Sequence, residues 1–73
     1  SDTGLDYDSV QEAMGGICLT IGEIQQATSH FQKVMEIYEN VFEFEPDMIE
    51  AKKQELLGTY TQAGLYLGKK MLE

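Results

Sequence analysis

Hydrophobic and polar residues recur with helical spacing through most of this 73-residue chain. The clearest pattern covers residues 30–44, where apolar side chains fill one half of a helical cylinder and polar side chains fill the other. One neighbouring helix cannot cover so wide an arc. The pattern therefore predicts that this helix packs against at least two others, or against one helix and a partner. Its apolar positions are Phe31, Val34, Met35, Ile37, Tyr38, Val41, Phe42 and Phe44.

Two capping boxes predict where the first two helices begin. Ser9 is followed three residues later by Glu12, an arrangement in which each side chain bonds the other residue's backbone N–H at a helix start. It predicts a first helix over about 10–26. A similar box at Ser29 predicts a turn just before it and a second helix over 30–44.

Pro46 predicts the end of the second helix, because proline lacks a backbone N–H and disfavours helical geometry in the residue before it. Asp47 can then cap a third helix over about 48–72. Residues 1–8 are polar and acidic, with no periodicity, and we expect a disordered lead there. The remaining residues, 9–73, are expected to form a single helical domain.

The fold expected is all-α, a small antiparallel bundle of three helices, or of four if Gly15 and Gly16 break the first helix. We expect that helix to continue, because its apolar spacing stays in phase across the glycine pair. Its expected inner face is Val10, Ala13, Met14, Ile17, Cys18, Ile21 and Ile24. On the third helix the expected inner stripe is Ile49, Leu56, Tyr60, Ala63 and Leu67, flanked by Leu57 and Met71.

The net charge of −8, from thirteen acidic residues against five lysines, narrows the range of partners. Nucleic-acid backbones and anionic membrane surfaces would be repelled. A basic protein segment is an electrostatically sensible partner, although a solvated acidic surface with no partner is the commoner explanation of such a charge. Seventy-three residues also make a core of marginal size, so stability is expected to depend on contacts outside the chain.

Cysteine content and hydropathy indicate an intracellular setting, expected to be the cytoplasm. The single cysteine, Cys18, cannot form an internal disulfide, which is compatible with a reducing compartment. No apolar run approaches the roughly 20 residues of a membrane span, and no secretory signal is visible. The chain ends inside a helical pattern, which fits a segment of a longer protein and equally a processed small protein.

A shift of 35 residues aligns parts of the chain with each other, for example Ile21 with Leu56 and Phe31 with Tyr66. The spacing resembles the tetratricopeptide repeat (TPR) over about 18–67, in the order Ile21, Gly22, Phe31, Val34, Tyr38, Val41 and Pro46. The resemblance implies a TPR-like helical hairpin fragment that binds a peptide or helix along a concave face. A plain three-helix bundle remains the alternative, because Val34 and Val41 stand where the family usually has alanine.

Candidate partner-binding residues follow from this resemblance and from the helical pattern. The exposed positions expected on the concave face are Gln25, Gln26, Lys52, Lys53 and Glu55. Leu65 and Leu72 lie on the far side of the third helix, which predicts either a turn near Gly64 or a second contact surface.

No group of residues has the composition of a catalytic, metal or cofactor site. His30 is the only histidine, and it has no carboxylate or cysteine at the spacing of a catalytic pair. We therefore expect a non-enzymatic protein-interaction module that buries an apolar helical surface with acidic rims. The alternatives are a homo-oligomeric structural subunit and, remotely, an acyl-carrier-like protein modified at Ser9.

Overall fold

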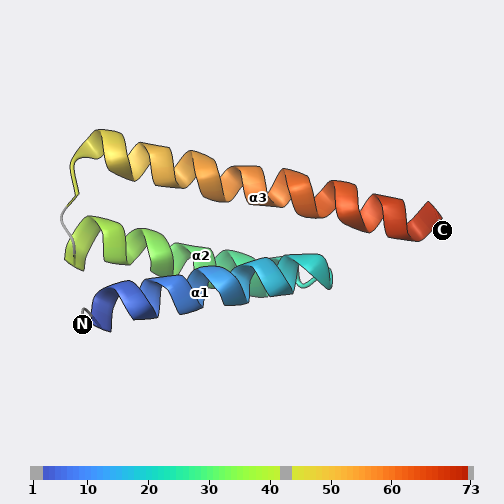
Figure 1. The fold of residues 1–73 in the computed structure, drawn as a ribbon, viewed down its shortest axis with the longest axis horizontal. Helices are drawn as coiled ribbons and strands as arrows, with labels where there is room; N and C mark the ends of the chain where they lie inside the picture. The colour runs from blue at the N-terminus through green and yellow to red at the C-terminus, as the bar shows by residue number, and fades with distance from the viewer. Residues whose placement is uncertain (1–2, 42–43, 73) are drawn as a thin grey trace.

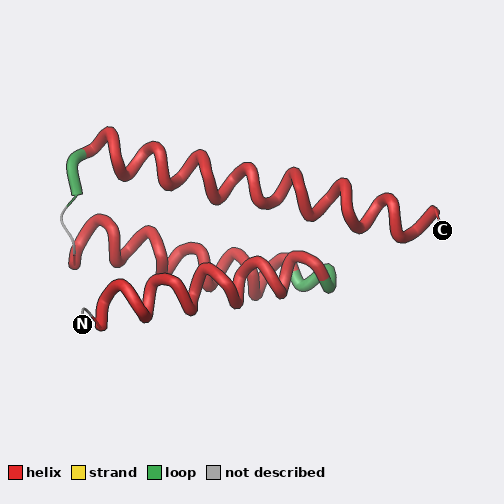
Figure 2. Tube along the Cα trace, viewed as in Figure 1, coloured by secondary structure: helices red, strands yellow, loops and turns green. Residues whose placement is uncertain are grey.

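The computed structural model of the protein describes residues 3–41 and 44–72, and every regular element within them is a helix. The expected all-α fold of three helices is confirmed (Figures 1 and 2). The elements are α1 (Thr3–Thr20), α2 (Ile24–Glu36), the π-helical continuation η1 (Ile37–Val41) and α3 (Pro46–Leu72).

The three helices run up, down and up, with α1 and α2 side by side and α3 along the pair (Figure 1). α3 has 27 residues, whereas α1 has 18, so α3 is the longer by about 13 Å at 1.5 Å per residue. Its C-terminal part extends past the turn between α1 and α2 (Figure 1). The molecule is correspondingly elongated, with extents of 43 × 23 × 20 Å.

α1 begins much earlier than the sequence pattern predicts. It starts at Thr3, so the expected disordered lead is wrong for residues 3–8, and residues 1–2 lie outside the described part. Ser9 lies within the helix and does not cap it. In this early part of α1, Asp8 is buried against the rest of the bundle with only 5% of its surface exposed.

α1 ends at Thr20, and the turn to α2 covers residues 21–23 instead of the predicted position just before Ser29. Gly22 adopts a left-handed conformation with φ of 83°, which glycine reaches without steric cost. The N–H of Gly22 donates to the carbonyl of Leu19, and that of Glu23 donates to Cys18. This Schellman pattern satisfies the last carbonyls of α1 and forces the chain to reverse there.

The boundary between the second and third helices lies close to Pro46, as predicted. η1 continues α2 to Val41, residues 42–43 lie outside the described part, and Phe44 lies outside the helices. Pro46 occupies the first position of α3, where a missing N–H costs nothing. Asp47 does not cap α3, because the carbonyl of Glu45 accepts the first helical bonds, but it lies in the first turn, where a carboxylate favours the helix dipole.

The core is built around α2, as its wide apolar arc predicts. Phe31, Val34 and Ile37 are buried, and Met35 and Tyr38 are half-buried. From the other helices Leu19, Leu56 and Ala63 complete the core, with Ala27 from α2. The prediction for Phe42 and for the side chain of Val41 lies outside the described residues.

The predicted inner face of α1 is wrong. Leu19, Gly15, Gln11 and Asp8 face the bundle, whereas most of the expected core residues face outward. The exposed ones are Val10, Ala13, Met14, Ile17, Ile21 and Ile24, and Cys18 is half-buried. α1 is therefore turned about its axis relative to the orientation that hydrophobicity alone predicts.

Gly15 explains this orientation in part. A Cβ atom at this position would lie 2.8 Å from Cδ1 and 2.9 Å from Cζ of Phe31, closer than real side chains approach. The missing side chain therefore lets the Phe31 ring lie directly against the α1 backbone. α1 passes through Gly15 and Gly16 without a break, and α3 passes through Gly64 in the same way, so the predicted continuity of α1 is confirmed.

Candidate functional site

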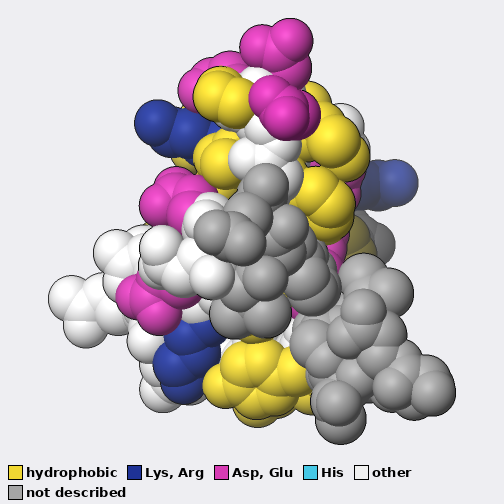
Figure 3. All heavy atoms as spheres, turned by 90° about the vertical axis from the view of Figure 1, so that its left-hand side faces the viewer, with side chains coloured by type: hydrophobic (Ala, Val, Ile, Leu, Met, Phe, Trp, Pro, Cys, Tyr) yellow, Lys and Arg dark blue, Asp and Glu magenta, His cyan; other side chains and the backbone are white. Residues whose placement is uncertain are grey.

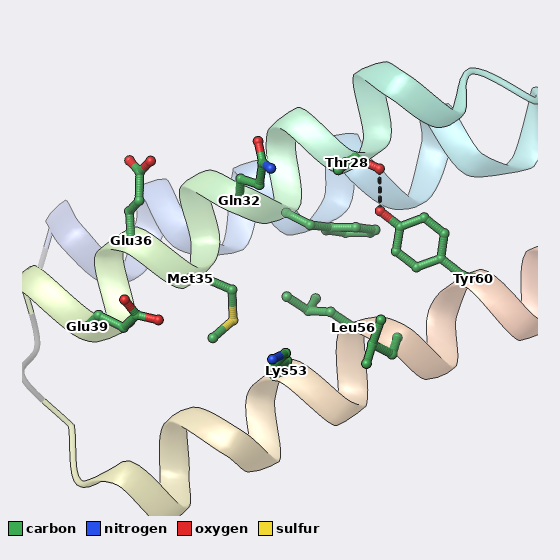
Figure 4. Close-up of a pocket in the computed structure, with 10 residues that line it drawn as sticks. Thr28, Gln32, Met35, Glu36, Glu39, Lys53, Leu56 and Tyr60 are labelled. Atoms are coloured by element: carbon green, nitrogen blue, oxygen red, sulfur yellow. Dashed lines mark hydrogen bonds between the residues drawn. The ribbon is translucent and has the colours of Figure 1, made fainter.

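An open groove of about 650 Å³ lies between α2 and α3 (Figure 4). Its floor is apolar, and its edges are polar or charged. The lining residues are Thr28, Phe31, Gln32, Met35, Glu36, Glu39, Lys53, Leu56, Leu57 and Tyr60. All of them belong to α2, η1 or α3, so the groove is separate from α1.

Aromatic and hydroxyl contacts hold one end of the groove together. The ring of Phe31 meets that of Tyr60 edge to face, with centroids 5.6 Å apart and planes at 69°. The hydroxyls of Thr28 and Tyr60 share a hydrogen bond of 2.6 Å (Figure 4). Since these bulky side chains span from one helix to the other, they keep α2 and α3 apart and leave the groove beside them.

The α2 side of the groove is polar and acidic. Gln32, Glu36 and Glu39 follow one another at helical spacings of four and three residues, and all three are exposed. Lys53 on α3 contributes a positive charge, which Figure 4 shows on the α3 side, across from Met35. The groove is thus lined by two acidic residues on the α2 and η1 side, of which Glu36 has its carboxylate pointing away from α3 in Figure 4, and by Lys53 on the α3 side.

Acidic side chains also gather at the end of the molecule where α3 begins. Figure 3 views this end, and at its top the acidic side chains lie over the N-terminal part of α3, with hydrophobic side chains exposed among them. Glu45, Asp47 and Glu50 are exposed there. This end of the molecule is therefore rich in negative charge, in keeping with the net charge of −8.

A second polar cluster, centred on Lys52, lies between α1 and α3. The Lys52 ammonium is 2.7 Å from the Glu12 carboxylate and 2.8 Å from that of Glu55, and it lies 5.5 Å from the centre of the Tyr38 ring. Burial by itself would lower the pKa of Lys52, but the hydrogen bonds to Glu12 and Glu55 outweigh it and raise the pKa. Burial also raises the pKa of Tyr38, an effect that Lys52 partly offsets.

Asp8 and His30 are two further polar residues near α1. His30 Nδ1 lies 2.7 Å from the Gln11 side-chain oxygen, a hydrogen bond that joins α1 to α2. The Oδ1 atom of Asp8 is buried and has no hydrogen-bond partner among the residues that the structure describes. Burial raises the pKa of the Asp8 carboxyl, the nearby Lys52 lowers it, and Glu12 and Glu55 raise it further. These groups connect the helices of the bundle.

The residues expected to bind a partner lie in four separate places. Lys53 lines the groove, whereas Lys52 and Glu55 form an ion pair with each other. Gln25 and Gln26 are exposed at the start of α2. Leu65 and Leu72 are exposed on the C-terminal part of α3, and α3 does not turn near Gly64. Ser9 is exposed on α1, preceded by six helical residues.

The sequence predicted acidic rims, but Glu36, Glu39 and Leu57 were not among the residues expected to bind a partner. A signal for the acidic edge is present, since Gln32, Glu36 and Glu39 follow the border of the apolar arc on the second helix. Leu57 was expected beside the core stripe, but it is 49% exposed and lines the groove. The part of the apolar arc left uncovered depends on the path of α3, which the helical period does not specify.

Two further findings limit the kinds of site that the described residues form. Among residues 3–41 and 44–72, no three metal-binding side chains come together in an arrangement that could hold an ion. In the same part of the chain no helix is both long enough and apolar enough to cross a membrane. Comparisons with models of known protein families, with curated proteins and with solved structures found no match to this chain.

Proposed function

We propose that this protein is a non-enzymatic interaction module whose α2–α3 groove binds one amphipathic, basic helix of a partner protein. The observation that carries the proposal is the open groove, with an apolar floor of Phe31, Met35 and Leu56 and with two acidic residues in its lining on the α2 and η1 side. Amphipathic helices bind hydrophobic grooves of this kind through apolar residues spaced by three or four positions.

The dimensions of the groove suit a short helix. Its lining on α2 and η1 extends from Thr28 to Glu39, which at 1.5 Å per residue corresponds to roughly 17 Å, or about three helical turns. A partner helix of that length presents apolar side chains at i, i+3 or i+4, and i+7. Three such anchors can contact Met35, Leu56 and Leu57 in turn.

The charge of the groove favours a basic partner. Glu36 and Glu39 can pair with Lys or Arg on the flank of the bound helix, and the net charge of −8 attracts such a helix from a distance. Lys53 lies on the other side of the groove. One acidic residue on the opposite flank of the partner would pair with it and fix the orientation of the helix.

The relationship to the TPR family stays a prediction, and the proposed groove does not depend on it. The resemblance places Ile21 and Gly22 inside the first helix of a repeat, whereas both lie in the turn between α1 and α2. The groove is formed by α2 and α3, which is a different surface from the concave face that the family implies.

A synthetic peptide can test the proposal. The probe is a fluorescein-labelled helix of about 14 residues with leucines at i, i+4, i+7 and i+11 and lysines on both flanks. We expect fluorescence anisotropy to show saturable binding that falls at least about ten-fold in the variant Glu36→Lys/Glu39→Lys, because like charges then meet at the groove edge. A peptide with glutamates in place of the lysines should bind the unmodified protein weakly.

The matched control is Glu23→Lys/Glu45→Lys, which changes the net charge by the same amount at two exposed positions outside the helices. If binding depends only on net charge, both variants weaken it equally, and the groove proposal fails. A second variant, Leu57→Asp, places a carboxylate at an exposed floor position and should also weaken binding. Circular dichroism confirms that each variant keeps its helical content.

A further inference from the structure

An apolar stripe runs along the outer face of α1 and into the turn that follows it, and α2 and α3 leave its side chains exposed. It consists of Tyr7, Val10, Met14, Ile17 and Ile21, spaced by three and four residues in alternation. Their exposed fractions lie between 41% and 66%. Spacings of three and four in alternation are the a and d positions of a coiled coil, a pattern that brings one helix against another.

Charge is almost absent along this stripe, although the chain as a whole is strongly acidic. Between Ser9 and Ile21 the only charged residue is Glu12, and its carboxylate binds Lys52 on the inner side of α1. A basic partner would find no carboxylate to pair with along most of this face. A second copy of the same uncharged face meets no like charge there, so the surface is complementary to itself.

The area of the stripe is close to what a specific dimer needs. Five large apolar side chains, each about half exposed, present on the order of 450 Å², since each carries roughly 150–200 Å². Two copies together would bury about 900 Å², which is in the range of weak specific interfaces.

The distribution of acidic residues selects the orientation. Asp6 and Asp8 lie near the start of α1, whereas the half from Ala13 to Ile21 carries no charge. A parallel pair would place the two acidic ends together, with both helix dipoles aligned. An antiparallel pair places each acidic end against the end of the other copy where Glu23 is the nearest carboxylate, which lowers the repulsion relative to a parallel pair and opposes the dipoles.

We propose that two copies of this chain form a twofold-symmetric dimer through an antiparallel pairing of their α1 stripes. Met14 of one copy then opposes Ile17 of the other, and Val10 opposes Ile21, which is the a-to-d pairing of antiparallel helices. The pairing buries α1 on both of its faces. The groove residues are all on other elements, so the dimer leaves two grooves open, and this inference does not rest on the function proposed for them.

Sedimentation equilibrium of the full chain between about 1 μM and about 1 mM tests the dimer, because this range covers weak and moderate dissociation constants. We expect the unmodified chain to be dimeric at the upper end. Ile17→Glu should raise the dissociation constant by at least about ten-fold, because a carboxylate is then desolvated at an apolar contact. The matched control is Leu65→Glu, since Leu65 is 67% exposed and Ile17 is 62% exposed. It should leave the dimer unchanged.

Val10→Glu is a second variant, and it should dissociate the dimer as Ile17→Glu does; circular dichroism verifies that both keep their helices. A chain that stays monomeric throughout would overturn the proposal and assign the stripe to another partner. So would a dimer that Leu65→Glu dissociates and Ile17→Glu does not.

Oxidation of the variant Tyr7→Cys/Cys18→Ser tests the orientation of the two α1 helices. Antiparallel pairing keeps the two Cys residues about 25 Å apart and gives no disulfide, whereas a disulfide-linked dimer would show parallel pairing.

Discussion

The contacts of α2 with its two neighbours differ in how closely the helices approach. Against α1, Phe31 lies on the bare backbone at Gly15, and no side chain separates the helices at that point. Against α3, the same ring meets the Tyr60 ring at a centroid distance of 5.6 Å, and the groove lies beside this contact. One buried aromatic residue thus fills the space on one side and acts as a spacer on the other. The difference shows that the residue opposite Phe31 decides whether a helix pair closes or leaves a groove.

The largest effect is expected from closing the space at Gly15. Gly15→Ala should lower the free energy of unfolding by about 1–3 kcal/mol, because the added methyl overpacks the site and displaces the buried Phe31 ring. Urea denaturation at a fixed protein concentration measures the change.

The adjacent glycine provides the control. A Cβ at Gly16 meets no atom within 4 Å, so Gly16→Ala should stabilise the protein by up to about 1 kcal/mol through helix propensity. If both substitutions stabilise the protein to the same extent, the close contact between Phe31 and α1 is not important for folding.

A smaller effect is expected at the contact between α2 and α3. Tyr60→Phe removes the hydroxyl that bonds Thr28 and should cost about 0.5–1.5 kcal/mol of stability. In a double-mutant cycle with Thr28→Val, the double variant should lose less stability than the sum of the two single losses, since each substitution removes the same bond. Tyr66→Phe, at a residue that is 50% exposed, should have an effect within about 0.5 kcal/mol. Equal effects of Tyr60→Phe and Tyr66→Phe would argue against the bond as a clamp at the end of the groove.

The smallest effect concerns the polar contact of α1 at Asp8. Because burial raises the pKa of this carboxyl above its usual 3.8, the folded state holds the proton more strongly than the unfolded state. Asp8 therefore destabilises the fold as the pH rises through its raised pKa, and this cost disappears as the pH falls to about 3.8. Asp8→Asn should be more stable than the unmodified protein at neutral pH, and the difference should shrink on acidification.

The quantity to measure is the difference in stability between Asp8→Asn and the unmodified protein, because Glu55 changes the stability with pH in the opposite direction. Its pKa is lowered by the hydrogen bond to Lys52, so its contribution to stability is lost as the pH falls. Thermal unfolding of the unmodified protein and of Asp8→Asn at a series of pH values isolates the contribution of Asp8, because both proteins contain Glu55. Asp47→Asn is the control for the loss of one carboxylate at an exposed position. A difference between Asp8→Asn and the unmodified protein that is independent of pH would show that Asp8 is not desolvated in the folded state.

The helices could be predicted from the sequence more accurately than their ends. Pro46 marks the boundary before α3 because its covalent structure acts locally, whatever the tertiary context. The capping boxes at Ser9 and Ser29 are also local patterns, but both serines lie inside helices. The turn lies instead at Gly22, where the hydrogen bonds of a C-terminal cap end α1, and the sequence analysis did not predict it.

The sequence predicted the chemical composition of the candidate site, an apolar helical surface with acidic rims, better than it predicted which residues line it. An apolar arc on the second helix that is too wide for one neighbour correctly predicts contact with both flanking helices. Of the residues expected to bind a partner, only Lys53 lines the groove, because Lys52 forms ion pairs with Glu12 and Glu55. Whether a lysine at such a position is free or paired depends on the residue opposite it on α1.

The sequence by itself determined an acidic, all-helical chain of three helices, with the wide apolar arc of α2 at its centre. Helical periodicity and proline act within a few residues, so these features need no knowledge of the fold. Only the tertiary structure decided which face of α1 points inward. Periodicity tells which residues share a face, but the direction of that face depends on contacts between helices, here Gly15 under Phe31 and Glu12 with Lys52.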